Sequence, residues 1–143
     1  MLTIKIKRFR EGVELPHKTN IGDWVDLRAA KDVTIAKGEF CMIPLGIGMK
    51  LPEGYEANIV PRSSTYKNFK IIQSNHFAVI DNSFCGDNDE WFYPVIALED
   101  TVIHKNDRIC QFRINKVQPD IKFEIVDRLD TEDRGGFGST GTR

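Results

Sequence analysis

Short apolar runs separated by turn residues constrain the fold of this chain more than any other feature. Near the N-terminus, Leu2, Ile4 and Ile6 alternate with polar residues, which is the two-residue period of a half-buried strand. Further strand-like runs are Asp32–Ile35, Phe40–Met49, Tyr55–Val60, Ala78–Ile80, Trp91–Leu98, Arg108–Val117 and Lys122–Val126. A convincing helical period is absent, and the best helical candidate is a turn or two at 64–68. The pattern predicts an all-β fold, either a barrel or a jelly-roll-like sandwich.

Length and charge narrow the class of protein. The chain has 143 residues, which is the size of one ordinary domain. Its formal net charge is -1, from 20 basic and 21 acidic residues, so we expect no nucleic acid partner. It has no apolar run near the ~20 residues of a membrane span, so we expect no membrane association. Cys41, Cys85 and Cys110 have no metal-ligand spacing, which favours free thiols in a reducing cytoplasm.

The C-terminal stretch Asp133–Arg143 is rich in glycine and contains one aromatic ring. Glycine inside a strand or helix costs about 0.5–1 kcal/mol relative to alanine, so we expect no regular structure there. Open backbone N–H groups, hydroxyls and Arg134 suit an anion, and Phe137 suits a planar ring. The alternative is a disordered polar terminus. We predict a β-barrel domain over 1–127 and a flexible arm over 128–143 that closes over an active site.

The segment Pro61–Thr65 directly follows a strand-like run that ends at Val60. Arg62 supplies a cation that can bind an anion through two hydrogen bonds, and Ser63 and Ser64 add hydroxyl donors. Together with exposed backbone N–H groups they make a phosphate-sized site. The alternative is a plain hydroxyl-stabilised turn at the end of a strand.

The segment Asn75–Gly86 is a hairpin candidate with its turn at 81–83. Asp81 follows two β-branched residues, so we expect it to be rigidly held and partly desolvated at a strand end. A carboxylate in such a place can orient and deprotonate a water molecule. The alternative is that Asp81 only caps the turn. Phe84 is either a core residue or a platform beneath a sugar.

Asp26 follows Trp24 and Val25, and Gln111 is a polar residue in an apolar strand. Magnesium that is bound to substrate phosphates keeps several waters and takes few protein carboxylates as ligands. Asp26 could therefore contact such an ion through water, or it could be an ordinary exposed strand residue. The amide of Gln111 can hold a water and a phosphate oxygen together, or pair with backbone. We interpret Asp87–Glu90 as a solvated turn, and the three histidines lack ligand spacing.

Five segments, read together and in order, resemble the trimeric dUTP diphosphatases (dUTPases). They are VDLRA at 25–29, PRSS at 61–64, AVIDNSFCG at 78–86, DRICQ at 107–111 and RGGFGSTG at 134–141. The resemblance implies a distorted jelly-roll or β-clip barrel and a homotrimer whose three active sites lie between subunits. It also implies hydrolysis of dUTP to dUMP and pyrophosphate, with Mg2+ bound to the triphosphate.

The resemblance further implies roles for single residues. Asp81 activates the water that attacks the α-phosphorus, Gln111 places that water, and Asp26 contacts magnesium through water. The implied phosphate-binding residues are Arg62, Ser63 and Ser64.

The base and sugar have their own implied partners. Asn75 and the backbone of Val79 and Ile80 read the uracil edge, while Phe84 lies against the deoxyribose. In the arm, Phe137 stacks on uracil. The arm residues implied to close on the phosphates are Arg134, Gly138, Ser139 and Thr140.

Three departures and three alternatives accompany this resemblance. Phe84 stands where the family usually has Tyr, and Ser64 stands where Gly is usual. The arm reads RGGFGSTG, which is shorter between Arg134 and Phe137 than the common RGxGGFGSTG. A dCTP deaminase of the same fold is one alternative, but that enzyme needs a Glu a few residues beyond the hairpin glycine. In this chain Trp91 occupies that position, and Glu90 and Glu99 are out of register with it. A bifunctional deaminase and diphosphatase is the second alternative, and a non-catalytic regulatory relative is the third.

Overall fold

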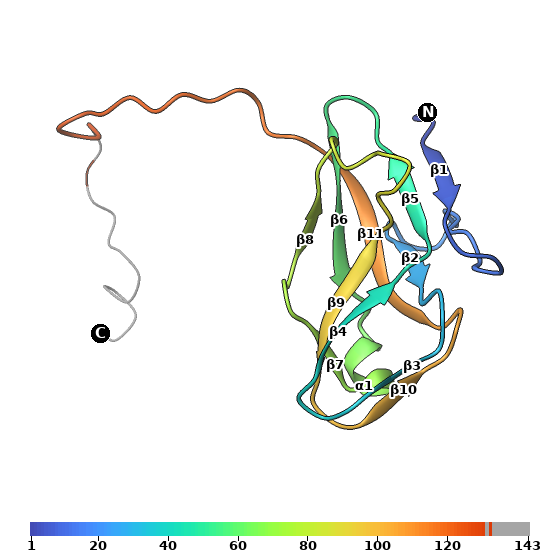
Figure 1. Ribbon diagram of the computed structural model, residues 1–143. Coiled ribbons are helices and arrows are strands. Elements are labelled where there is room, and N and C mark those ends of the chain that lie inside the picture. The colour runs from blue at the N-terminus through green and yellow to red at the C-terminus, as the bar shows by residue number, and fades with distance from the viewer. Residues whose placement is uncertain (131, 133–143) are drawn as a thin grey trace, which may run out of the picture.

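Extended backbone dominates the computed structural model, which describes residues 1–130 and 132 (Figure 1). In chain order the elements are β1 Lys5–Arg8, β2 Val25–Arg28, β3 Val33–Ile35, β4 Phe40–Pro44, β5 Ile47–Lys50, β6 Tyr55–Pro61, α1 Thr65–Phe69, β7 Ile71–Gln73, β8 Ala78–Ile80, β9 Phe92–Ala97, β10 Thr101–Ile103 and β11 Arg108–Lys116. The prediction of an all-β fold is confirmed, and the short helix falls on the predicted helical turn. In the described part of the chain, no helix is long and apolar enough to cross a membrane.

The strands pair into small antiparallel sheets that surround one core. The largest sheet has the order β2-β11-β6-β8, and a second has the order β4-β9-β7. Strand β1 pairs with β5, and β3 pairs with β10. Figure 1 shows β8 on one side of the body and β1 on the opposite side. Because β8 ends the order of the largest sheet, its far edge is not paired within the described residues.

Alternation along the central strands separates a core face from an outer face. Ile59 and Phe112 lie opposite each other and are buried, as is Cys110 two residues before Phe112. Their neighbours point the other way, because successive side chains of a strand lie on opposite faces. Gln111, which is paired with both Asp26 and Val60, therefore lies on the outer face. This outer face carries Gln111 and its partner Asp26.

Within the body, one strand prediction needs correction and three short strands were missed. The run Phe40–Met49 is divided into β4 and β5, because the chain turns at Gly46, where φ is +72°. A Cβ at Gly46 would lie only 2.8 Å from the Cβ of Ala30, so this turn has no room for a larger residue. The short strands β2, β7 and β10 were not predicted as strands, because three or four residues give little periodic signal.

The predicted hairpin at 75–86 is also wrong. A turn does form at its predicted place, where the Phe84 N–H donates to the Asp81 carbonyl at 3.0 Å. However, β8 pairs with β6, and the next strand, β9, belongs to another sheet. The loop between them is held against the segment after β1 and the turn before β5, since the Glu90 carboxylate accepts bonds from Arg10 at 2.7 Å and the Gly46 N–H at 3.1 Å.

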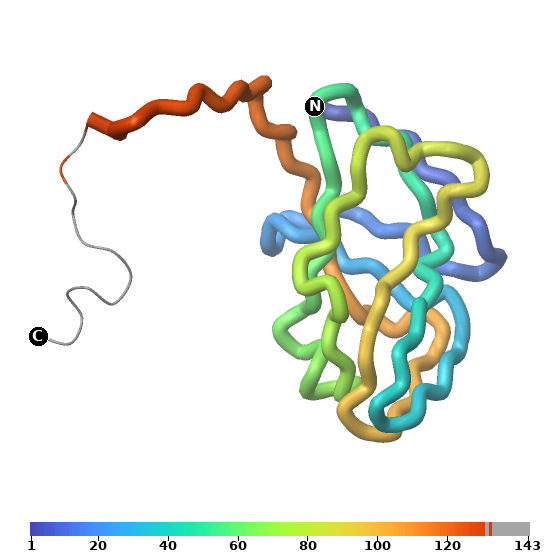
Figure 2. Tube along the Cα trace, turned by 60° about the vertical axis from the view of Figure 1, so that its left-hand side comes forward, coloured from blue at the N-terminus to red at the C-terminus, as the bar shows by residue number. Residues whose placement is uncertain are grey.

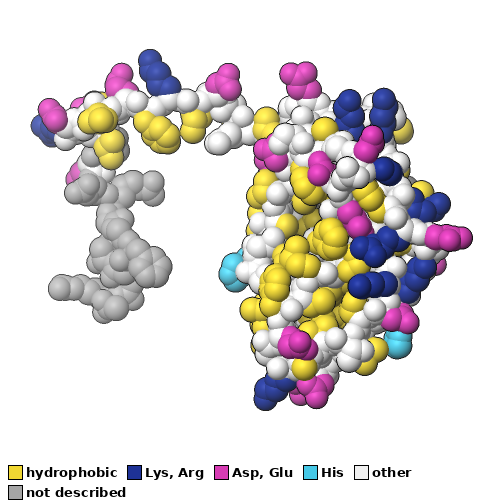
Figure 3. Space-filling model, viewed as in Figure 1, with side chains coloured by type: hydrophobic (Ala, Val, Ile, Leu, Met, Phe, Trp, Pro, Cys, Tyr) yellow, Lys and Arg dark blue, Asp and Glu magenta, His cyan; other side chains and the backbone are white. Residues whose placement is uncertain are grey.

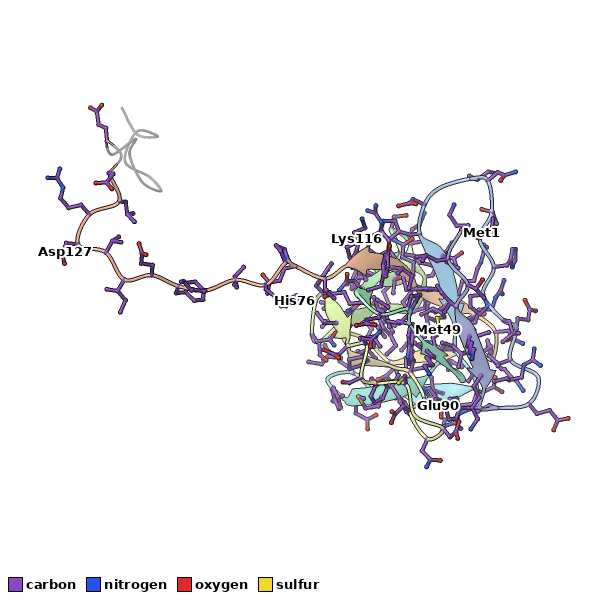
Figure 4. The ribbon with its side chains drawn as sticks, turned by 90° about the horizontal axis from the view of Figure 1, so that it is seen from above. Met1, Met49, His76, Glu90, Lys116 and Asp127 are labelled. Carbon is purple, nitrogen blue, oxygen red and sulfur yellow. The ribbon has the colours of Figure 1, made fainter. Side chains whose placement is uncertain are left out.

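Beyond β11, the described residues leave the body as an extended segment (Figures 1 and 2). Figure 4 shows the segment running from Lys116, at the edge of the body, to the distant Asp127. The Val117 N–H still donates to the Gly54 carbonyl at 3.0 Å. The predicted strand at Lys122–Val126 is wrong for the single chain, because no described strand pairs with it.

Candidate active site

A cluster of cationic and polar side chains forms where β2, β6 and β11 meet. Arg62 Nε lies 2.9 Å from Asp26 Oδ1, and Arg108 Nη1 lies 3.5 Å from Asp26 Oδ2. Arg62 Nη1 donates to Ser64 Oγ at 3.3 Å. Asp26 thus holds two guanidinium groups side by side on the outer face. We call Asp26, Arg62, Ser63, Ser64, Arg108 and Gln111 the arginine cluster.

The backbone of the Arg62 turn is fixed by Thr65. Thr65 Oγ1 accepts a bond from the Arg62 N–H at 2.8 Å and donates to the Ile109 carbonyl at 2.9 Å. The Thr65 N–H donates in turn to the Arg62 carbonyl at 3.0 Å. The predicted hydroxyl-stabilised turn is therefore present, and it leaves Ser63 exposed for a ligand.

Gln111 lies between Asp26 and the Arg62 turn. It pairs with Asp26 across the β2–β11 ladder, and its Nε2 donates to the Pro61 carbonyl at 3.2 Å. In the free chain this amide therefore pairs with backbone, which was one of the two alternatives. The structure brings the predicted phosphate and magnesium residues into one place.

A second group lies along β8 and its flanking turns, and we call it the β8 edge: Asn75, Val79, Ile80, Asp81 and Phe84. Asp81 Oδ1 accepts a bond from the Ser83 N–H at 2.7 Å. This backbone bond, with a side-chain bond from Ser83, lowers the pKa of Asp81 below its ordinary value. The expectation that Asp81 is partly desolvated is wrong for the single chain, because the carboxylate is exposed.

Asn82 anchors the turn that contains Asp81. Asn82 Nδ2 donates at 2.9 Å to the carbonyls of both Leu51 and Pro52, in the connection between β5 and β6. Val79 is 59% exposed and Phe84 is 39% exposed, so both side chains are available for contact. The structure therefore places an ionised carboxylate beside an apolar surface on the free edge of a sheet.

Asn75 stands at the other end of β8. Its Oδ1 accepts a bond from Gln73 Nε2 at 2.9 Å, and the same nitrogen donates to the Ile59 carbonyl at 2.9 Å. A hollow of about 210 Å3 separates this turn from the Arg62 turn, and its lining includes Arg62, Ser63, Gln73 and His76. The Asn75 end of β8 is thus the end nearer to Arg62.

The Asp81 end of β8 points away from the arginine cluster of the same chain. Ile80 pairs with Ala57, and Arg62 comes five residues after Ala57 along β6. At a rise of about 3.3 Å per residue, Asp81 and Arg62 are roughly 15–20 Å apart along the strand. One chain therefore presents the two groups as separate half-sites.

Some predicted residues lie outside the described part of the chain, and others were missed. Arg134, Phe137, Gly138, Ser139 and Thr140 lie outside the described residues. Sequence reasoning assigned no role to Thr65, Gln73 or Arg108. Arg108 lay within a recognised segment, and Gln73 was a polar residue in an apolar run, but their partners are distant in sequence.

The described residues hold no group of three His, Cys, Asp or Glu side chains that could form a protein metal cage. Asp26 alone offers a half-buried carboxylate between two arginines. This donor set fits a hard cation that keeps most of its own waters, which is how Mg2+ binds on substrate phosphates.

The sequence is similar to those of two bacterial nucleotidohydrolases. The chain is 59% identical over 142 residues to the SPbeta prophage-derived deoxyuridine 5'-triphosphate nucleotidohydrolase of Bacillus subtilis, covering 99% of this chain and 100% of that protein. It is 40% identical over 134 residues to the deoxyuridine 5'-triphosphate nucleotidohydrolase of Finegoldia magna, covering 89% and 91%.

Solved structures agree on the fold. The dUTPase of Streptococcus mutans superposes with a TM-score of 0.73 at 18% identity, over 82% of this chain and 98% of that one. The dUTPase of Staphylococcus bacteriophage 80alpha, solved with dUPNHPP, gives a TM-score of 0.78 at 17% identity, over 99% of both chains. The dUTPase family model matches residues 17–141. The chain belongs to the dUTPase family.

Proposed function

We propose that this chain hydrolyses dUTP to dUMP and pyrophosphate. The observation that carries the proposal is the Asp81 carboxylate, ionised and exposed at the end of an edge strand. Its relatives named deoxyuridine 5'-triphosphate nucleotidohydrolases cover nearly the whole chain, which supports the same reaction here.

Asp81 serves as the general base. The Ser83 N–H bonds to Oδ1 and so orients the carboxylate, which is exposed and can accept a proton from water. The oxygen of that water attacks the α-phosphorus in line, the bond from the α-phosphorus to the bridging oxygen breaks, and pyrophosphate leaves. Gln111, on the outer face of β11, is placed to orient the same water and an α-phosphate oxygen.

The arginine cluster holds the triphosphate. Phosphoryl transfer depends mainly on positioning and on neutralising charge, and Arg62 with Ser63 and Ser64 supplies both. Bound Mg2+ neutralises charge on the phosphate oxygens. Asp26 would hold it through water, because one carboxylate shared with two arginines suits an outer shell better than direct coordination.

The direction of β8 calls for a second copy of the chain. With the base at Asn75 and the sugar at Phe84, the triphosphate extends beyond Asp81, away from the Arg62 of the same chain. An arginine cluster must therefore come from a neighbouring subunit, which supports a homotrimer with shared active sites.

Exposed apolar surfaces support the same assembly. Phe123 is 90% exposed and Ile125 is 98% exposed on the extended segment after β11. On the body, Phe40, Ile96 and Ile72 pair in one row across β4, β9 and β7, each at least 40% exposed. Figure 3 shows apolar side chains gathered over this part of the body. Large exposed apolar areas are typical of subunit interfaces.

The arm completes the proposal. We assign 1–127 to the β domain and 128–143 to an arm that closes over a bound nucleotide. Phe137 stacks on the uracil, and the phosphate-binding arm residues are Arg134, Gly138, Ser139 and Thr140. The three cysteines are free thiols, which suits an enzyme of the reducing cytoplasm.

The structure disfavours deamination as the alternative. Trp91 is fully buried, and Glu90 is already bound to Arg10 and the Gly46 N–H, so no free Glu stands at the deaminase position. Pyrophosphate and ammonia release should be measured with dUTP, dCTP, dTTP and UTP, with Mg2+ and then with EDTA. We expect pyrophosphate from dUTP alone, suppressed by EDTA. Ammonia from dCTP, or no reaction with any nucleotide, would contradict the proposal.

A further inference from the structure

Gln73 is a buried polar residue beside the base-reading end of β8. It is 3% exposed, and its Nε2 donates both to the Ile59 carbonyl and to Asn75 Oδ1, each at 2.9 Å. Its own Oε1 is buried without a hydrogen-bond partner among the described residues. A buried acceptor without a partner is costly, so this arrangement needs a reason.

The Ile59 carbonyl fixes the orientation of both amides. A backbone carbonyl can only accept, so the group of Gln73 that contacts it must be the NH2 group. That group has a second hydrogen, and its partner on Asn75 must also accept, so it is Oδ1. Asn75 Nδ2 therefore points away from Gln73, and no other described residue takes its hydrogens.

We propose that Gln73 is a positioning residue that determines base specificity by making Asn75 present a hydrogen-bond donor. This inference rests on the proposed function, in which Asn75 faces the base. Uracil has a carbonyl acceptor at position 4, whereas cytosine has an amino donor there. A fixed N–H donor binds the first and repels the second.

The unpaired Oε1 supports this role over simple packing. Leu or Met would fill a buried position on β7 without leaving a polar atom unpaired. The NH2 group of glutamine can donate to a backbone carbonyl and to a side-chain oxygen at once, which an apolar side chain cannot do. The ability of the Gln73 amide to donate hydrogen bonds, rather than its volume, is therefore what matters at this position.

Two substitutions separate polarity from packing. In Gln73→Glu the NH2 group is lost, and the carboxyl group has at most one hydrogen, so it cannot donate to both the Ile59 carbonyl and Asn75. Asn75 should then turn and present Oδ1 outward. In Gln73→Met the volume is kept, but nothing fixes Asn75. Asn88→Asp makes the same amide-to-carboxylate change at an exposed loop position and serves as the matched control.

The ratio of kcat/KM for dUTP to that for dCTP measures the effect. We expect a fall of about tenfold or more in Gln73→Glu, a smaller fall in Gln73→Met, and no change in Asn88→Asp. An unchanged ratio in both folded Gln73 variants would overturn the inference while leaving dUTP hydrolysis intact. A wild-type protein without activity on dUTP would instead overturn the proposed function.

A measurement on the wild-type protein tests the same inference if the Gln73 variants fail to fold. Side-chain amide signals should be followed by 15N NMR during titration with dUMP and, separately, dCMP. We expect slowly exchanging Gln73 amide protons in both cases and a shift of the Asn75 amide signals with dUMP. Asn75 signals that do not move with dUMP, or move equally with dCMP, would contradict the inference.

Discussion

Arg62 Nε lies 2.9 Å from Asp26 Oδ1, and this ion pair joins the turn after β6 to strand β2. The same carboxylate also holds Arg108 at 3.5 Å. Asp26 thus sets the position of the two guanidinium groups, of which the proposed function assigns Arg62 to the triphosphate. In the same proposal, Asp26 would hold Mg2+ through water.

Asp26→Asn should therefore raise the Mg2+ concentration needed for half-maximal activity and lower kcat/KM. Losses of about 10–100-fold are usual when a residue that supports a metal through another group is removed. Asp23→Asn is the control, because it removes an exposed ion pair of the same length, 2.9 Å to Arg113, on a nearby part of the surface. Steady-state rates measured over a series of Mg2+ concentrations give both quantities for each variant. Equal changes in Asp26→Asn and Asp23→Asn would count against the role of Asp26.

Thr65 should control both stability and phosphate binding. It is 1% exposed, and its hydroxyl bonds to the Arg62 N–H and the Ile109 carbonyl. Thr65→Val leaves both groups unpaired, so we expect a loss of about 1–3 kcal/mol in the free energy of unfolding and a raised KM for dUTP. Thr65→Ser keeps the hydroxyl and should restore KM. Urea unfolding gives the free energy of unfolding, and steady-state kinetics give KM. If KM in Thr65→Ser is raised as much as in Thr65→Val, the hydroxyl does not have this role.

Asp81 should remain ionised throughout the neutral range. Its pKa in the fold lies below the ordinary value of about 3.9, because the Ser83 N–H and hydroxyl bond to the charged form. Its contribution to stability is therefore present above that ordinary value and is lost as the pH falls through the lowered pKa. Titration of the Asp81 carboxyl carbon by 13C NMR should show the shift.

Ser83→Ala should move this titration part of the way back toward the ordinary pKa. The side-chain bond is lost in this variant, but the stronger backbone bond remains. Ser74→Ala removes an exposed hydroxyl elsewhere in the site region and should leave the titration of Asp81 unchanged. A Ser83→Ala titration identical to the wild type would contradict the assigned cause.

The segment after β11 should hold subunits together through its apolar side chains. Phe123 and Ile125 alternate with Lys122 and Glu124, and all four are exposed in the single chain. The double variant Phe123→Ser/Ile125→Ser should shift sedimentation equilibrium toward smaller species. Lys122→Ser/Glu124→Ser changes the alternate positions and should sediment like the wild type. Equal behaviour of both double variants would remove this segment from the interface.

Sequence patterns predicted the elements that have their own periodicity or turn chemistry. Tyr55–Val60 and Arg108–Val117 appear as β6 and β11 almost residue for residue. The patterns failed where pairing decides the structure. Ala78–Ile80 is a strand, but its partner is β6 rather than the segment that follows it. Lys122–Val126 has the right alternation, but in one chain it has no partner strand.

The sequence indicated candidate site residues but not how they are arranged in space. The recognised segments contain Asp26, Arg62 and Gln111, which the structure brings together. Sequence order does not reveal that β8 runs antiparallel to β6 and so carries Asp81 away from Arg62. It also does not reveal the contact between Gln73 and Ile59, because that contact depends on how two sheets pack.

The central claim is that one active site combines the β8 edge of one chain with the arginine cluster of another. Asp81→Ala and Arg62→Ala should each be inactive as pure proteins. After the two are unfolded together in equal amounts and refolded, mixed trimers should recover activity in about one third of their sites, which is about one quarter of all sites in the mixture. No recovery in mixed trimers, with both variants folded, would show that the two groups act within one chain and would contradict the claim.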